Sequence, residues 1–132
     1  MTVQTRVLSQ AEAGPLRAAL SVASWPAPAL VSLEDTRLGE ILVVGLSAAP
    51  FLAARLETFA DGADAPAAPI PLGDWLVLKG RYPTILHVSQ RGCALNFDRG
   101  LARLAVGLLR RLLAEAKTRP LGDLVAARDQ RA

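Results

Sequence analysis

The sequence is poor in the side chains on which most enzymatic and metal chemistry depends. Among its 132 residues there is one cysteine, Cys93, and one histidine, His87. A single cysteine cannot form an intrachain disulfide, so the chain is not a disulfide-stabilised secreted scaffold. One cysteine and one histidine cannot build a Cys/His zinc site, and a Ser-His-Asp mechanism would have to use His87. We therefore expect no catalytic residues, no metal and no cofactor.

The sequence also lacks a long uninterrupted apolar run. Its first ten residues, MTVQTRVLSQ, have no apolar core of the kind found in a signal peptide. The longest apolar stretch, residues 100–116, contains Arg103, Arg110 and Arg111, unlike the run of about 20 apolar residues that crosses a bilayer. We expect a soluble, cytoplasmic protein with no membrane span.

What the sequence has in abundance is apolar residues, which make up 52% of the chain. A domain of this size has limited interior in which to bury them. We therefore expect a single domain over residues 1–132, with part of its apolar surface in contact with another chain. A homodimer would provide such a contact.

Charge is distributed unevenly along the chain. Residues 75–132 contain 11 basic and 4 acidic side chains, whereas residues 1–74 contain 4 basic and 8 acidic ones. A basic half of this kind is typical of a nucleic-acid surface, or of a surface on which a second protein docks. It is also typical of a solvated helix face that binds nothing.

The apolar pattern predicts eight elements in the order α-β-β-α-β-β-β-α. The first helix has two candidate starts, because Ser9 forms a capping-box pattern with Glu12, but Pro15 would break a helix begun at Ser9. We favour a start at Pro15 and an end at Trp25-Pro26. The apolar face of this helix would contain Leu16, Ala19, Leu20 and Ala23.

The middle of the chain predicts strands on either side of a second helix. Ser47 is a candidate cap for that helix, and Gly62 a candidate stop. Residues 61–71, DGADAPAAPIP, predict an extended surface loop. The predicted strands lie near residues 29–33, 40–46, 75–79, 84–89 and 93–97. This order predicts the α+β class, with helices packed on a mostly antiparallel five-stranded sheet.

The last helix has the clearest pattern. Asp98 is a good N-cap before a wide leucine stripe, Pro120 and Gly122 close the helix, and residues 121–132 form a short helix or a tail. A basic line runs opposite the leucines and consists of Arg99, Arg103, Arg110 and Lys117. This basic line either contacts phosphates or an acidic partner, or is the solvated face of an amphipathic helix.

Two further patterns suggest contacts between backbones or chains. Glycine inside a helix is unfavourable by roughly 1 kcal/mol relative to alanine, so Gly100 and Gly107 on one line indicate close approach of another backbone. That backbone would be a strand of this chain or a helix of a second subunit. The predicted second helix has an apolar stripe that we take as a candidate interface, formed by Leu52, Leu56 and Phe59.

His87 and Cys93 are the only residues that suggest nucleophilic chemistry. His87 lies in the middle of one predicted strand, Cys93 begins the next, and Arg91 is nearby. Catalysis would require the two side chains to lie within hydrogen-bond reach. The structural alternative, which we favour, is a partly exposed histidine and a small buried apolar cysteine.

The order of elements resembles the roadblock/LC7 family of small profilin-like domains. The resemblance spans residues 15–116, with ALVSLEDTRLGEILVVGLS as the first hairpin and ALNFDRGLARLAVGLLRRLL as the last strand and final helix. It implies a homodimer that binds a partner, often a Ras-like GTPase, and that has no catalytic residues of its own.

These observations favour a non-enzymatic adaptor, regulatory or assembly subunit that acts through protein–protein contacts. The alternative is a nucleic-acid-binding module that uses the basic face of the last helix. A third hypothesis is a small enzyme or ligand-binding domain that uses His87 and Cys93.

Overall fold

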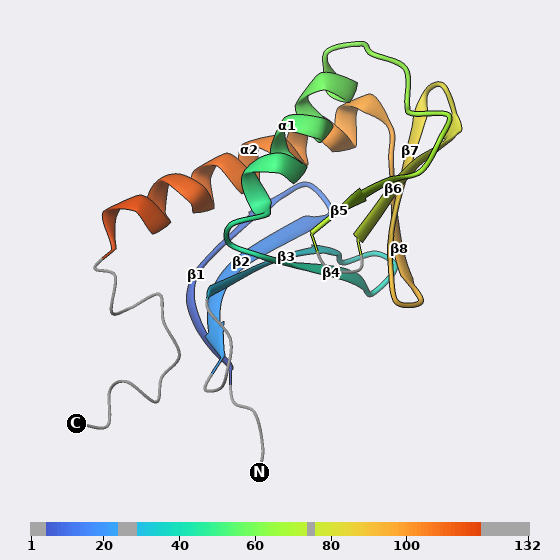
Figure 1. Ribbon diagram of the computed structural model, residues 1–132. Coiled ribbons are helices and arrows are strands. Elements are labelled where there is room, and N and C mark those ends of the chain that lie inside the picture. Colours follow the sequence, from blue (N-terminus) through green and yellow to red (C-terminus); the bar gives the residue numbers. More distant parts are fainter. Residues whose placement is uncertain (1–4, 24–28, 74–75, 120–132) are drawn as a thin grey trace, which may run out of the picture.

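Four strands and a helix occur twice along the chain. The computed structural model describes residues 5–23, 29–73 and 76–119 (Figure 1). The first half contains β1 (Thr5–Ala13), β2 (Leu16–Ala23), β3 (Ala29–Asp35), β4 (Glu40–Gly45) and α1 (Ala49–Ala60). The second half contains β5 (Ile70–Leu72), β6 (Leu76–Tyr82), β7 (Ile85–Gln90), β8 (Cys93–Phe97) and α2 (Arg99–Thr118). The predicted α+β class is confirmed.

Two antiparallel four-stranded sheets, β1-β2-β3-β4 and β5-β6-β7-β8, replace the predicted five-stranded sheet. The main error lies at the N-terminus, where the predicted helix from Pro15 is strand β2. Its buried apolar residues alternate at period two, as Leu16, Ala18, Leu20 and Val22. Gly14, with φ at 56°, and Pro15 form the turn between β1 and β2, so Pro15 does not begin a helix. The capping-box pattern of Ser9 and Glu12 lies within β1.

The structure confirms the later elements more closely. Strands β3, β4, β7 and β8 coincide with predicted ones, and Asp98 caps α2 by accepting a hydrogen bond from the Leu101 N–H at 2.7 Å. Helix α1 begins after Ala48 rather than Ser47, without a side-chain cap. The predicted loop is shorter, because Ile70–Leu72 form β5. Some predicted helix ends, strand ends and tail segments lie outside the described residues, namely those at Trp25-Pro26, Trp75, Pro120, Gly122 and residues 121–132.

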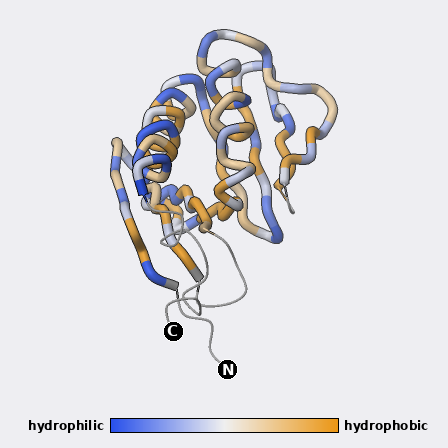
Figure 2. Tube along the Cα trace, turned by 60° about the vertical axis from the view of Figure 1, so that its left-hand side comes forward, coloured by the Kyte–Doolittle hydropathy of each residue, from blue (hydrophilic) through white to orange (hydrophobic). Residues whose placement is uncertain are grey.

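Each helix lies against the sheet formed by the other half of the chain. Helix α2 packs on β1, β2 and β3 of the first sheet, while α1 lies beside α2 and faces the second sheet (Figures 1 and 2). The inner faces of both sheets and the facing sides of the helices form one core. Its largest fully buried side chains include Phe97, Leu16, Leu20, Leu33, Leu52, Leu56, Leu78 and Leu109. No helix in the described part of the chain is long and apolar enough to cross a membrane.

The sheets meet where β4 and β8 lie side by side. Gln90, at the end of β7, donates from Nε2 to the Val43 carbonyl at 2.6 Å and accepts from the Val43 N–H at 2.8 Å. The Glu40 carboxylate accepts from the Ala94 N–H at 3.3 Å. Side chains therefore satisfy part of the backbone at this junction, where the sheets do not continue into one another.

Candidate partner-binding groove

The structure places the predicted interface residues of α1 in the core. Leu52, Leu56 and Phe59 are 1%, 0% and 3% exposed. The physical reason is that α1 lies between α2 and the second sheet, whereas the prediction had it covering one face of a single sheet. These three side chains are therefore already covered within the chain and offer no surface to a second one.

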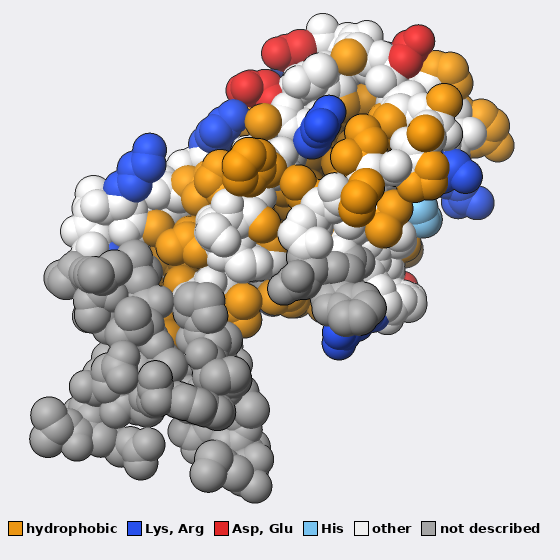
Figure 3. All heavy atoms as spheres, viewed as in Figure 1, with side chains coloured by type: hydrophobic (Ala, Val, Ile, Leu, Met, Phe, Trp, Pro, Cys, Tyr) orange, Lys and Arg blue, Asp and Glu red, His pale blue; other side chains and the backbone are white. Residues whose placement is uncertain are grey.

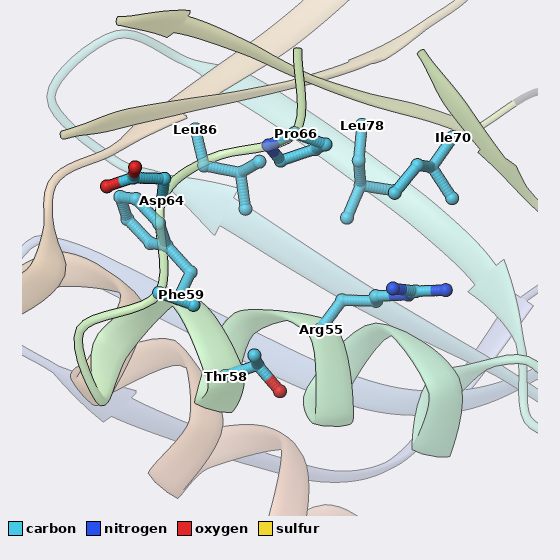
Figure 4. A pocket seen from close by; sticks show the side chains of 9 residues that line it. Arg55, Thr58, Phe59, Asp64, Pro66, Ile70, Leu78 and Leu86 are labelled. Atoms are coloured by element: carbon cyan, nitrogen blue, oxygen red, sulfur yellow. The ribbon is translucent and has the colours of Figure 1, made fainter. Parts of the chain in front are cut away.

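The surface that α1 leaves open is a groove between this helix, the 61–69 loop and the second sheet (Figure 4). We call it the α1 groove; it encloses about 100 Å³. Its lining consists of Arg55, Thr58, Phe59, Ala63, Asp64, Pro66, Ile70, Leu78 and Leu86. A dry apolar cavity of roughly 150 Å³ can hold a benzene molecule, so the α1 groove has room for one aliphatic side chain.

Opposite charges lie at the two ends of the α1 groove. Figure 4 shows Asp64 on the loop beside Phe59, and Arg55 reaching from α1 on the side of Leu78 and Ile70. Neither the Arg55 guanidinium nor the Asp64 carboxylate forms a hydrogen bond or ion pair with the described part of the chain. The groove therefore combines an apolar floor with one cation and one anion that are available to a ligand.

Apolar surface continues from the groove along α1. Phe51 precedes Arg55 by four residues, so the two side chains share one face of the helix, and Phe51 is 64% exposed. Figure 3 shows apolar side chains gathered on this side of the molecule, over α1 and the neighbouring part of the second sheet. An exposed phenylalanine next to an apolar groove is typical of a surface that binds another protein.

Gly80 fixes the outer wall of the groove. Its N–H donates to the Pro66 carbonyl at 2.7 Å, and the Ala65 N–H donates to the Pro83 carbonyl at 3.0 Å. A Cβ at position 80 would lie 2.7 Å from the Ala65 Cβ and 3.0 Å from the Pro66 oxygen. Only glycine lets the loop approach β6 this closely, so the wall is formed before any ligand binds.

Two members of the basic line hold the C-terminal end of α1. Arg99 donates from Nη1 to the carbonyls of Phe59 and Ala63, at 2.5 and 2.8 Å, and lies 4.8 Å from the centre of the Phe59 ring. Arg103 donates to the Ala60 carbonyl at 2.7 Å. Cations stabilise the partial negative charge at a helix C-terminus, so both arginines support the end of α1 that carries the groove.

The other members of the basic line lie further along α2. Arg110 is half-exposed and forms a 3.4 Å ion pair with Glu57 of α1. Lys117 is exposed in the last turn of α2. In the basic line, Arg99, Arg103 and Arg110 thus contact α1 or the loop after it, whereas Lys117 faces solvent.

Gly100 and Gly107 are exposed, and the described part of the chain provides no close backbone at either position. Nothing described lies within 4 Å of a Cβ built on Gly107, and the Cβ built on Gly100 meets only the Asp98 side chain. An approaching strand from the described residues therefore does not explain these glycines.

His87 and Cys93 are not brought together as a catalytic pair. His87 Nδ1 lies 2.7 Å from Asn96 Oδ1, whereas Cys93 is paired in register with Gln90. The described residues contain no group of three or more side chains that could hold a metal ion.

Comparison with known proteins adds no family to this description. No model of a protein family matches the chain, and no curated protein matches it. The sequence pattern predicted a loop over 61–71, of which Ile70 and Pro71 belong to β5, but not that the loop packs against β6 beside α1. Arg55, Asp64, Ile70, Leu78 and Leu86 were therefore missed as residues of the groove.

Proposed function

We propose that the chain is a non-enzymatic adaptor or assembly subunit that binds a partner protein through the α1 groove. The observation that carries this proposal is a preformed apolar groove with available charges at its ends and an exposed phenylalanine beside it. Apolar pockets that receive one anchoring side chain dominate the energetics of protein interfaces.

The geometry defines the chemistry of the partner. The occupant is an exposed segment whose aliphatic side chain enters the α1 groove between Phe59, Leu78 and Leu86. A carboxylate on that segment pairs with Arg55, and a basic group on its other side reaches Asp64. Such charges select the orientation of the segment more than they add to its affinity.

Selection from a peptide library tests this proposal. Peptides selected on the full-length protein should contain one apolar residue flanked by an acidic residue. Their affinity should fall by about tenfold or more for Ala63→Trp, which fills the groove from the loop. The matched control is Ala54→Trp, an exposed alanine on α1 that does not line the groove. Equal loss in both variants, or none in either, would contradict the proposal.

Three sequence-based expectations stay predictions. Homodimerisation, a Ras-like GTPase as the partner, and nucleic-acid binding by the basic face of α2 have no direct support in the geometry. The order of elements that suggested the roadblock/LC7 resemblance differs from that of the structure at residues 16–23, which form β2. For the nucleic-acid alternative, Arg110 and Lys117 remain the more accessible cations, because Arg99 and Arg103 donate to α1.

A further inference from the structure

The outer face of the second sheet carries a row of polar side chains opposite the α1 groove. Lys79 of β6 is in register with His87 of β7, which is in register with Asn96 of β8. Residues paired in this way on adjacent strands have Cβ atoms about 5 Å apart. Because side chains alternate along a strand, this row faces away from Leu78 and Leu86, which line the groove on the inner face.

A β-bulge adds an aromatic ring to this face. The β6–β7 register shifts between Gly80 and Tyr82, so that Tyr82 pairs with Ile85 and Arg81 is the extra residue. In a regular strand Tyr82, three residues after Lys79, would point to the opposite face. The bulge instead places Tyr82 on the side of Ile85 and His87, and bulges of this kind commonly redirect side chains at binding sites.

The resulting depression is basic. Its lining consists of Lys79, Gly80, Arg81, Tyr82 and His87, and it encloses about 450 Å³. No carboxylate lines it, and neither Lys79 nor Arg81 forms an ion pair within the part of the chain that the structure describes. Uncompensated cations on adjacent positions repel one another, so an anion bound among them is stabilised.

His87 and Tyr82 narrow the class of ligand. The contact of His87 Nδ1 with Asn96 Oδ1 places a proton on Nδ1, since the amide oxygen only accepts, and leaves Nε2 as an acceptor for an N–H or O–H group of a ligand. Tyr82 is 68% exposed, so its ring offers a flat apolar surface beside the cations. Cations combined with an exposed aromatic ring on a sheet face are typical of sites where a base stacks and a phosphate pairs.

We propose that this depression binds a nucleotide unit, with the base stacked on Tyr82, the phosphate held by Lys79 and Arg81, and His87 Nε2 accepting a hydrogen bond from the base or the sugar. The unit is either a free nucleotide or one nucleotide of a single strand, and both present the same chemistry. The site lies on the opposite face of the sheet from the α1 groove, so it does not depend on the proposed function.

Binding of fluorescent ligands to the full-length protein at low salt tests this site. The probes are a labelled nucleoside monophosphate and a labelled single-stranded DNA of about 12 nucleotides. Binding of the monophosphate identifies a free nucleotide as the ligand, and binding of the oligonucleotide alone identifies a strand; either result supports the site. Binding of neither probe overturns it.

Variants separate this site from unspecific attraction to a basic protein. Tyr82→Ala and Lys79→Ala should each weaken binding by roughly tenfold, whereas Tyr82→Phe, which keeps the ring, should retain it. Arg6→Ala removes an exposed cation of β1, away from the depression, and should leave the affinity unchanged. Unchanged binding by Tyr82→Ala, or an equal loss in Arg6→Ala, would overturn the proposal. The three substituted positions are exposed, so the variants should fold.

Discussion

The side chain of Gln90 satisfies both the N–H and the carbonyl of Val43, and so joins β4, the edge strand of the first sheet, to the second sheet. These atoms are 47 residues apart in sequence, and the contact is partly buried. A glutamine amide suits this position because it presents one donor and one acceptor to the two groups of a single backbone residue. The arrangement also covers part of an edge that would otherwise be open to pairing with another strand.

Gln90→Ala should lower the free energy of unfolding by about 1–3 kcal/mol, because it leaves a partly buried donor and a partly buried acceptor unsatisfied. Chemical denaturation measures the change. The control is Gln10→Ala, an exposed glutamine on β1, which should alter stability by less than about 0.5 kcal/mol. Equal effects of the two substitutions would show that Gln90 does not stabilise the junction of the sheets.

Gly80 and Gly107 should respond in opposite ways to alanine. Gly80→Ala forces a Cβ into the 61–69 loop and should destabilise the fold by about 1–3 kcal/mol. Gly107→Ala meets nothing within 4 Å in the described chain and should stabilise α2 by up to about 1 kcal/mol. Thermal unfolding of both variants checks the pair. A stabilising Gly80→Ala would mean that the loop is not held against β6.

Arg99 should matter for stability more than Arg110, although both belong to the basic line. Arg99→Ala leaves the Phe59 carbonyl of α1 and the Ala63 carbonyl of the following loop without their charged donor and should lower the free energy of unfolding by about 1.5–3 kcal/mol. Arg110→Ala removes only an exposed ion pair with Glu57 and should change it by less than about 1 kcal/mol. If Arg110→Ala were the more damaging change, the basic line would not support α1 as described.

Acid should weaken the turn between β3 and β4. The hydrogen bonds from the Arg37 side chain to the Asp35 carboxylate, with smaller help from the Arg37 and Leu38 N–H groups and the guanidinium charge, lower the pKa of Asp35 below its usual 3.8. Because the folded-state pKa is lowered, the stabilisation is complete above the unfolded pKa. It is lost as the pH falls through the folded-state value.

Denaturation of wild type and Asp35→Asn at several pH values checks this linkage. The amide introduced by this substitution would keep an acceptor for the Arg37 N–H but lose the charge. The wild type should be the more stable protein at about pH 6, and the difference should shrink towards about pH 3. A difference independent of pH would show that the charge of Asp35 does not contribute.

Local signals predicted α2 and the later strands well. Asp98 caps its helix as its sequence context indicates, and the leucine stripe of α2 follows helical spacing. Strand β2 was missed because LRAALSVA is rich in Ala and Leu, which favour helices, while its strand state depends on pairing with β1 and β3.

The residues of the α1 groove could not be predicted from the sequence for a similar reason. Arg55, Asp64 and Leu78 belong to a helix, a loop and a strand, and they meet only because α1 crosses to the second sheet. No short sequence pattern indicates that α1 packs on the second sheet and α2 on the first. The basic line was correctly located on α2, but its partial use in holding α1 depends on the packing of two helices far apart in sequence.

The most direct test of the α1 groove as a partner-binding site is a charge exchange measured by calorimetry. A selected peptide with an acidic residue next to its apolar anchor, and the same peptide with lysine there, are each titrated into wild type and Arg55→Glu. The wild type should prefer the acidic peptide and Arg55→Glu the lysine peptide, with a coupling of about 1 kcal/mol or more. Arg6→Glu, a charge reversal at an exposed arginine of β1, should keep the wild-type preference. If Arg55→Glu bound both peptides as the wild type does, the partner would not lie in the α1 groove.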